Sequence, residues 1–240
     1  MELSKRLAAI AAMAEPGDRL ADIGTDHGYL PIYLVEQNIA PSAIAMDVVE
    51  GPLARASAHV REHGLEEKIV LRKSDGFEKL LPGEADAAVI AGMGGPLMIR
   101  ILEEGKKTAE SLKYLILSPQ SELPKVRRYL AENRYETVSE AMALEDGKYY
   151  TVMKVFPGAG TGGPLPYIEE KYGTCLLRKR DPVLFSWLIK ERETLDALRA
   201  SLLQAGSERA KERLAQVERE LETAAEAIRL YKGGEGCDQM

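Results

Sequence analysis

The sequence contains few of the residues that build disulfide frameworks or zinc sites. Only two cysteines, Cys175 and Cys237, occur in 240 residues, and neither belongs to a metal-like cluster. Two of the three histidines, His59 and His63, are one helical turn apart, but no HExxH arrangement accompanies them. We therefore expect no disulfide framework and no metal ion, and we interpret both histidines as exposed helix residues.

Long hydrophobic runs are also missing, and no apolar segment approaches the length of a membrane span. Residues 1–14 have an amphipathic pattern without signal-peptide features, so we expect a cytoplasmic protein that does not bind membranes. A net charge of −6 argues against a broad phosphate-binding surface. Local basic clusters at Lys5-Arg6 and at Arg178 to Arg180 are either solvated surface or nucleic-acid contacts.

What the sequence does contain is an apolar run, residues 20–23, that stops at a glycine turn before a helix. Gly24 and Gly28 allow the backbone to bend and approach a ligand, and the helix directs its positive end into the same space. A dinucleotide fingerprint needs glycine where Asp26 stands, because a carboxylate repels pyrophosphate. S-adenosylmethionine carries a sulfonium and an ammonium group, so Asp22 and Asp26 suit it. The alternative is an ordinary turn whose aspartates cap the helix.

Apolar runs and helical patterns alternate beyond this turn. We expect strands at residues 43–46, 69–71, 86–91 and 114–117, followed by a hairpin of residues 136–144 and 149–156. This order predicts an α/β, Rossmann-like fold with a mostly parallel sheet and one antiparallel strand. Ligands bind such sheets at the carboxyl ends of the strands.

A glycine- and proline-rich stretch, residues 157–166, suggests a boundary between two domains, residues 1–157 and 158–240. The second domain shows apolar residues at heptad spacing in two long segments, which predict a helical hairpin resembling an antiparallel coiled coil. Such a hairpin suits either substrate capture or assembly. We expect a monomer or a weak dimer.

Acidic residues or glycines follow the first four expected strands, and each group can be assigned to a part of S-adenosylmethionine. Asp47 closes the second strand, where an acid accepts hydrogen bonds from ribose hydroxyls, and Asp75 follows the third strand, near the adenine amine. The glycine-rich residues after the fourth strand are expected between donor and acceptor. The full set of expected cofactor residues is Asp22, Gly24, Thr25, Asp26, His27, Gly28, Tyr29, Asp47, Val48, Asp75, Gly76, Ala91, Gly92, Met93 and Gly94.

Three segments resemble the bacterial family that methylates N1 of adenine 22 in tRNA: Leu3-Ser-Lys-Arg-Leu7, Asp22-Ile-Gly-Thr-Asp-His-Gly-Tyr-Leu-Pro31 and Ala91-Gly-Met-Gly-Gly95. The resemblance covers most of the chain. It implies a class I methyltransferase fold, S-adenosylmethionine as donor, and a helical appendage that helps to hold tRNA. The segment Leu117-Ser-Pro-Gln120 departs from the Gln-Pro-Asn version of that family.

A tRNA methyltransferase of this kind must extrude the target base, because N1 is engaged in pairing inside a duplex. A carboxylate near the exocyclic amine orients the base and stabilises the positive charge that develops, and Asp26 is the candidate. The candidate substrate contacts are Lys5, Arg6, Arg178 and Arg180. Two alternatives remain: a methyltransferase for a small molecule or protein, and a non-catalytic cofactor-binding module with a partner-docking coiled coil.

Overall fold

The computed structural model describes residues 1–205 and 207–232, and the chain divides into two compact units, one ending at Leu165 and the next beginning at Pro166. Cys175 lies half-buried in the second unit, whereas Cys237 lies outside the described residues. Among the described residues, no helix is long and apolar enough to cross a membrane.

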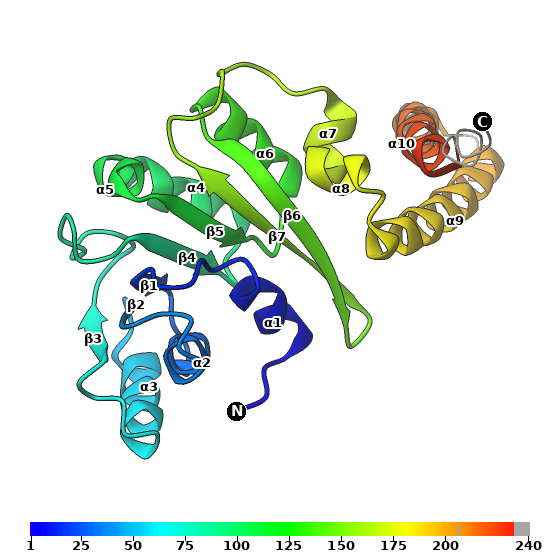
Figure 1. Cartoon of the computed structure of the whole chain (residues 1–240). Coiled ribbons are helices and arrows are strands. Elements are labelled where there is room, and N and C mark those ends of the chain that lie inside the picture. Colours follow the sequence, from blue (N-terminus) through cyan, green and yellow to red (C-terminus); the bar gives the residue numbers. More distant parts are fainter. Residues whose placement is uncertain (206, 233–240) are drawn as a thin grey trace, which may run out of the picture. The chain divides into compact units, whose positions relative to one another are not determined.

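The first unit is built on a seven-stranded sheet with the order β3-β2-β1-β4-β5-β7-β6 (Figure 1). The strands are β1 (Leu20–Ile23), β2 (Ala43–Asp47), β3 (Ile69–Lys73), β4 (Ala87–Ala91), β5 (Tyr114–Ser118), β6 (Glu136–Glu145) and β7 (Lys148–Phe156). Strand β7 runs antiparallel to both β5 and β6, while β1 to β5 pair in parallel. The expected Rossmann-like sheet with one antiparallel strand is therefore confirmed.

Helices cover both faces of this sheet (Figure 1). They are α1 (Lys5–Ala11), α2 (Tyr29–Glu36), α3 (Glu50–Glu62), α4 (Gly95–Glu104), α5 (Lys106–Ser111) and α6 (Leu123–Glu132). The pleat of β1 places Leu20 in the core under α1 and α2, and Ala21 and Ile23 in the core under α4 to α6. Because side chains alternate along a strand, Asp22 lies on the same face as Leu20, toward α1 and α2.

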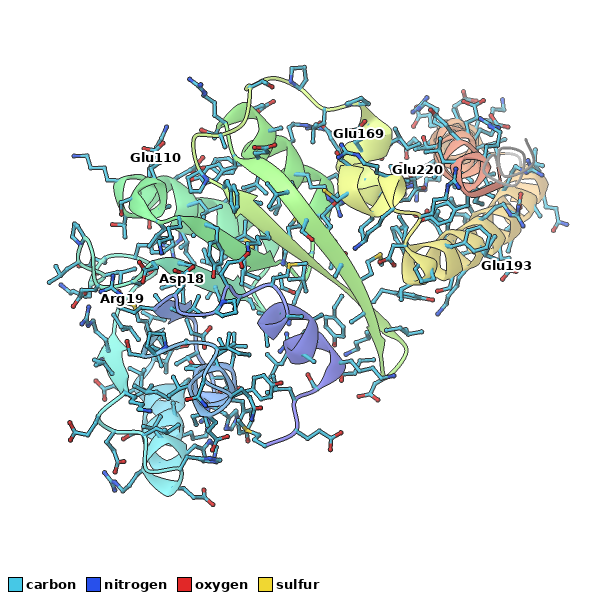
Figure 2. The ribbon with its side chains drawn as sticks, in the orientation of Figure 1. Asp18, Arg19, Glu110, Glu169, Glu193 and Glu220 are labelled. Carbon is cyan, nitrogen blue, oxygen red and sulfur yellow. The ribbon has the colours of Figure 1, made fainter. Side chains whose placement is uncertain are left out.

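Charged side chains at the N-terminal ends of the strands pair with one another. Asp18 and Arg19, labelled in Figure 2, precede β1; Arg19 bonds Asp86 at 2.8 Å, and Lys113 contacts Asp18 at 2.5 Å. The hydrogen bonds from Arg19 hold the pKa of Asp86 below its ordinary value. Each of these charged side chains has a partner of opposite charge, so few of the polar groups at this edge of the sheet are left for a ligand to bind.

The second unit consists of α7 (Tyr167–Tyr172), α8 (Thr174–Arg178), α9 (Pro182–Ala205) and α10 (Glu208–Lys232). Asp181 starts α9, because its Oδ1 accepts hydrogen bonds from the backbone of Val183 and Leu184 at 2.9 and 3.1 Å. Lys171 is ion-paired with Glu220, which is labelled in Figure 2, and joins α7 to α10. The two long helices expected from the heptad pattern are present and pack against each other.

Candidate active site

The turn that follows β1 is tied to the neighbouring strand. Gly24 has φ = 81°, and the backbone N–H groups of Gly24 and Thr25 both donate to the carbonyl of Met46 in β2, at 2.8 Å. Gly28 has φ = 71° and caps α2; a Cβ on this residue would lie 3.2 Å from the Cβ of Ala56 in α3. Both glycines therefore occupy a backbone conformation that other residues adopt at a cost.

A cavity of about 380 Å³ opens above this turn. Its wall comes from α1, from the turn and the start of α2, and from the residues that follow β4 and β5. The lining residues are Arg6, Leu7, Asp22, Gly24, Thr25, Asp26, His27, Gly28, Tyr29, Leu30, Ala91, Gly92 and Gln120. Strand β4 lies between β1 and β5, so the cavity spans the carboxyl ends of three adjacent parallel strands.

Internal partners satisfy only part of the polar groups that line this cavity. Burial raises the pKa of Asp22 to about 6; the side chain of Thr25 opposes this shift, and the charge of Asp47 reinforces it. The buried Nδ1 of His27 has no hydrogen-bond partner among the described residues. A buried polar group without a partner costs free energy, so these groups suit a polar ligand. Asp22 is suited to a cationic group in particular, because a nearby positive charge favours its ionised form.

Helix α3 holds the turn through two side chains one helical turn apart. Arg55 Nη2 donates to Asp26 Oδ1 at 2.6 Å, and His59 Nδ1 lies 2.8 Å from the carbonyl oxygen of His27. Since a carbonyl can only accept, Nδ1 of His59 carries the hydrogen. The His59 ring also stacks on Tyr29, with the ring centroids 5.2 Å apart.

The expectation that His59 is an exposed helix residue is therefore wrong. His59 is half-buried because Ala56, on the same side of α3, packs against Gly28 and brings this face of the helix to the turn. His63, one helical turn further on, is exposed as expected and pairs with Glu36. In the described part of the chain, no group of three or more His, Cys, Asp or Glu side chains could hold a metal ion.

The remaining expected cofactor residues lie outside the lining of this cavity. Asp47 accepts a hydrogen bond from Val49 N at 2.7 Å at the end of β2, and the adjacent Val48 is exposed. Asp75 is ion-paired with Arg100 at 3.1 Å and, with Gly76, lines a separate cavity. The roles assigned to Asp47, Val48, Asp75 and Gly76 stay predictions.

The glycine-rich segment after β4 contributes differently along its length. Gly92 lines the cavity, and its backbone N donates to Ser118 O at 3.1 Å. Met93 folds back over the turn, with its terminal methyl 2.1 Å from the position that a Cβ on Gly24 would take. Gly94 is the residue that caps α4. Met93 thus fills space beside the turn, and its flexible side chain can yield to a ligand.

The four basic residues expected at the substrate fall in different places. Arg6 lines the cavity and lies over the ring of Tyr150, 5.4 Å from its centroid. Lys5 is exposed on α1. Arg178 and Arg180 line a separate cavity of about 520 Å³ within the second unit. Three contributors, Arg55, His59 and Gln120, were not assigned from the sequence, because they come from elements whose packing the sequence does not reveal.

A family model described as a methyltransferase domain matches residues 3–153 of the chain. The tRNA (adenine(22)-N(1))-methyltransferase of Bacillus subtilis is 34% identical over 232 residues, covering 95% of this chain and 98% of the relative. The chain belongs to the bacterial tRNA (adenine(22)-N1)-methyltransferase family.

Solved structures of family members have the same fold as this chain. The crystal structure of the B. subtilis M1A22 tRNA methyltransferase TrmK is 33% identical and covers 95% of this chain and 99% of its own, with a TM-score of 0.81. A Streptococcus pneumoniae relative in complex with S-adenosyl-L-methionine is also 33% identical, with a TM-score of 0.83, and covers 95% and 100% of the two chains. These likenesses extend over both units.

We expect that removing His59 weakens binding of the methyl donor more than removing His63. His59→Ala deletes the bond to the His27 carbonyl and one stacked ring, and a hydrogen bond contributes about 1 kcal/mol. The dissociation constant for S-adenosylmethionine, measured by calorimetry, should rise about five- to tenfold. His63→Ala, which removes an imidazole from the same helix, is the control. Equal affinities in the two variants would show that His59 does not position the donor site.

Proposed function

We propose that the protein transfers a methyl group from S-adenosylmethionine to N1 of adenine 22 in tRNA. Family membership over nearly the full chain supports the reaction. The structure supports the proposal through one observation. A single cavity is lined both by the turn after β1, with its aspartate and glycines, and by Gly92 and Gln120, which follow β4 and β5. This arrangement supports neighbouring positions for the donor and the acceptor in one cavity.

The residues of the turn suit the donor. Ionised Asp22 would accept hydrogen bonds from the donor's ammonium group, and the left-handed glycines let the backbone approach it. Asp26 stands where a dinucleotide fingerprint needs glycine, and its carboxylate would repel a pyrophosphate. Asp47, at the end of β2, is the proposed acceptor for the ribose hydroxyls. The donor supplies a methyl group activated by a positively charged sulfur.

In the reaction the lone pair of adenine N1 attacks the methyl carbon as the carbon–sulfur bond breaks and its electron pair passes to sulfur. The sulfonium charge is lost and the adenine becomes cationic, so no proton has to leave. The protein's task is to orient the two groups and to stabilise positive charge on the base. We assign the second task to Asp26, whose side chain is 66% exposed.

The Asp26–Arg55 ion pair does not exclude this role. Both side chains are largely accessible to solvent, and exposed pairs contribute about 0–1 kcal/mol. The exocyclic amine of the target base can therefore approach Asp26 while Arg55 keeps the carboxylate directed to the turn.

Labelled donor, purified protein and unmodified tRNA provide the test of this function. Nucleoside mapping should find 1-methyladenine at position 22, and Asp26→Asn should lower kcat more than it raises the apparent Kd for tRNA, because the charge is needed as the adenine becomes cationic. Tight donor binding without any modified nucleoside would instead indicate a binding module. Modification of a small molecule or a protein would support the other alternative.

We further propose that the second unit helps to hold tRNA. The protein is then expected in the cytoplasm, where its tRNA substrate is made. Arg178 and Arg180 lie close to each other at one cavity of this unit, as phosphate contacts often do. The same cavity is lined by Glu169 and Glu226, so the unit is not uniformly basic. Its contribution is thus expected to come from a few directed contacts.

Charge reversal in the full-length protein tests that contribution. Arg178→Glu with Arg180→Glu should weaken tRNA binding several-fold and make it less dependent on salt, because fewer counterions are released, while donor binding is unchanged. Lys106→Glu with Lys107→Glu makes the same change in net charge on α5 and serves as the control. A loss of self-association with unchanged tRNA binding would identify the hairpin as an assembly device.

A further inference from the structure

The side chain of Gln120 lies at the part of the cavity farthest along the sheet from the donor turn. Gln120 follows β5, and its backbone N donates to the carbonyl of Met93 at 2.8 Å, which joins the loops after β4 and β5. In strand order the turn after β1 comes first, Gly92 after β4 comes next, and Gln120 after β5 is last. A group bound between Gly92 and Gln120 therefore lies beside the donor and not in its place.

The amide of Gln120 is available to a ligand. Gln120 is exposed to the cavity, and its side chain makes no hydrogen bond among the described residues. Its Nε2 lies 3.8 Å from the position that a Cβ on Gly92 would take, and Arg6 Nη1 lies 3.4 Å from the same position. The ends of these two flexible side chains thus flank the backbone of Gly92, and a flat ring that displaces the guanidinium of Arg6 from it meets the amide of Gln120.

We propose that Gln120 recognises the Hoogsteen edge of the target adenine. This inference rests on the proposed function, which requires N1 of the base to face the methyl group. With N1 so directed, and with Asp26 approaching the amino hydrogen on the N1 side, the other amino hydrogen and N7 remain free on the adjoining edge of the ring. A glutamine amide pairs with both at once, because its oxygen accepts from the 6-amino group and its nitrogen donates to N7.

The same arrangement predicts selection against guanine. Guanine presents two acceptors, O6 and N7, on this edge, so the oxygen of Gln120 would meet O6 without a hydrogen between them. Guanine also carries a hydrogen on N1, which leaves that nitrogen without the lone pair needed for attack. Gln120 thus adds recognition of the base to the chemical requirement at N1.

The experiment compares tRNA carrying adenine at position 22 with tRNA carrying 7-deazaadenine there, which lacks the N7 acceptor. For the wild-type protein, the deaza substitution should lower kcat/KM about tenfold, the effect of a lost base contact. Gln120→Ala should lower kcat/KM on ordinary tRNA by about the same factor and show no further loss on the deaza substrate. Gln37→Ala, which changes an exposed glutamine after α2, should behave as wild type.

Two results would overturn the proposal: wild-type kcat/KM for Gln120→Ala on ordinary tRNA, or an equal loss on the deaza substrate for Gln120→Ala and the wild type. The deaza substitution can change the intrinsic reactivity of N1, but it does so equally for both proteins. The ratio of their kcat/KM values on each substrate is therefore free of this effect. Absence of 1-methyladenine from ordinary tRNA treated with the wild-type protein is a separate outcome. It would overturn the proposed function, and with it this proposal.

Discussion

The contact between helix α3 and the turn after β1 is the constraint on which the candidate site depends. Arg55 and His59 bond to Asp26 and to the carbonyl of His27, and the close approach of Ala56 requires glycine at position 28. These contacts, together with the bonds from Gly24 and Thr25 to β2, hold a turn that contains two left-handed glycines. A fixed turn lets Asp22, Asp26 and the following helix act on one ligand, because placement contributes much of the catalysis in methyl transfer.

The two edges of the sheet differ in how their charges are satisfied. At the N-terminal ends of the strands, Arg19, Asp86 and Lys113 pair internally. At the carboxyl ends, Asp22 is half-buried and makes no ion pair with any described residue, and the amide of Gln120 makes no hydrogen bond in that part of the chain. The strand order then places these groups in one cavity, because β4 lies between β1 and β5. The strand order and the incompletely bonded polar groups therefore both indicate the same candidate site.

Much of the fold was predictable from the sequence because its signals are local. Apolar runs indicated each strand within one or two residues, and the glycine and acid pattern after β1 indicated the turn that lines the cavity. His59 was misinterpreted because its exposure depends on which face of α3 packs against Gly28, a tertiary contact. The position of Asp75 after a strand was predictable from the sequence. Its ion pair with Arg100 and its place in a separate cavity were not, because both depend on the packing of α4.

The titration of Asp22 tests the central claim most directly, because the turn is a donor site only if this acid binds the donor's ammonium. Burial sets the pKa of Asp22 at about 6 in the free protein, and a bound cation lowers it. Calorimetry at about pH 6 in buffers of different ionisation enthalpy should therefore detect proton release when S-adenosylmethionine binds. The affinity should fall as the pH drops below about 6, and Asp22→Asn should abolish the release. Donor binding with no proton release in the wild type would contradict the assignment of Asp22 to the donor.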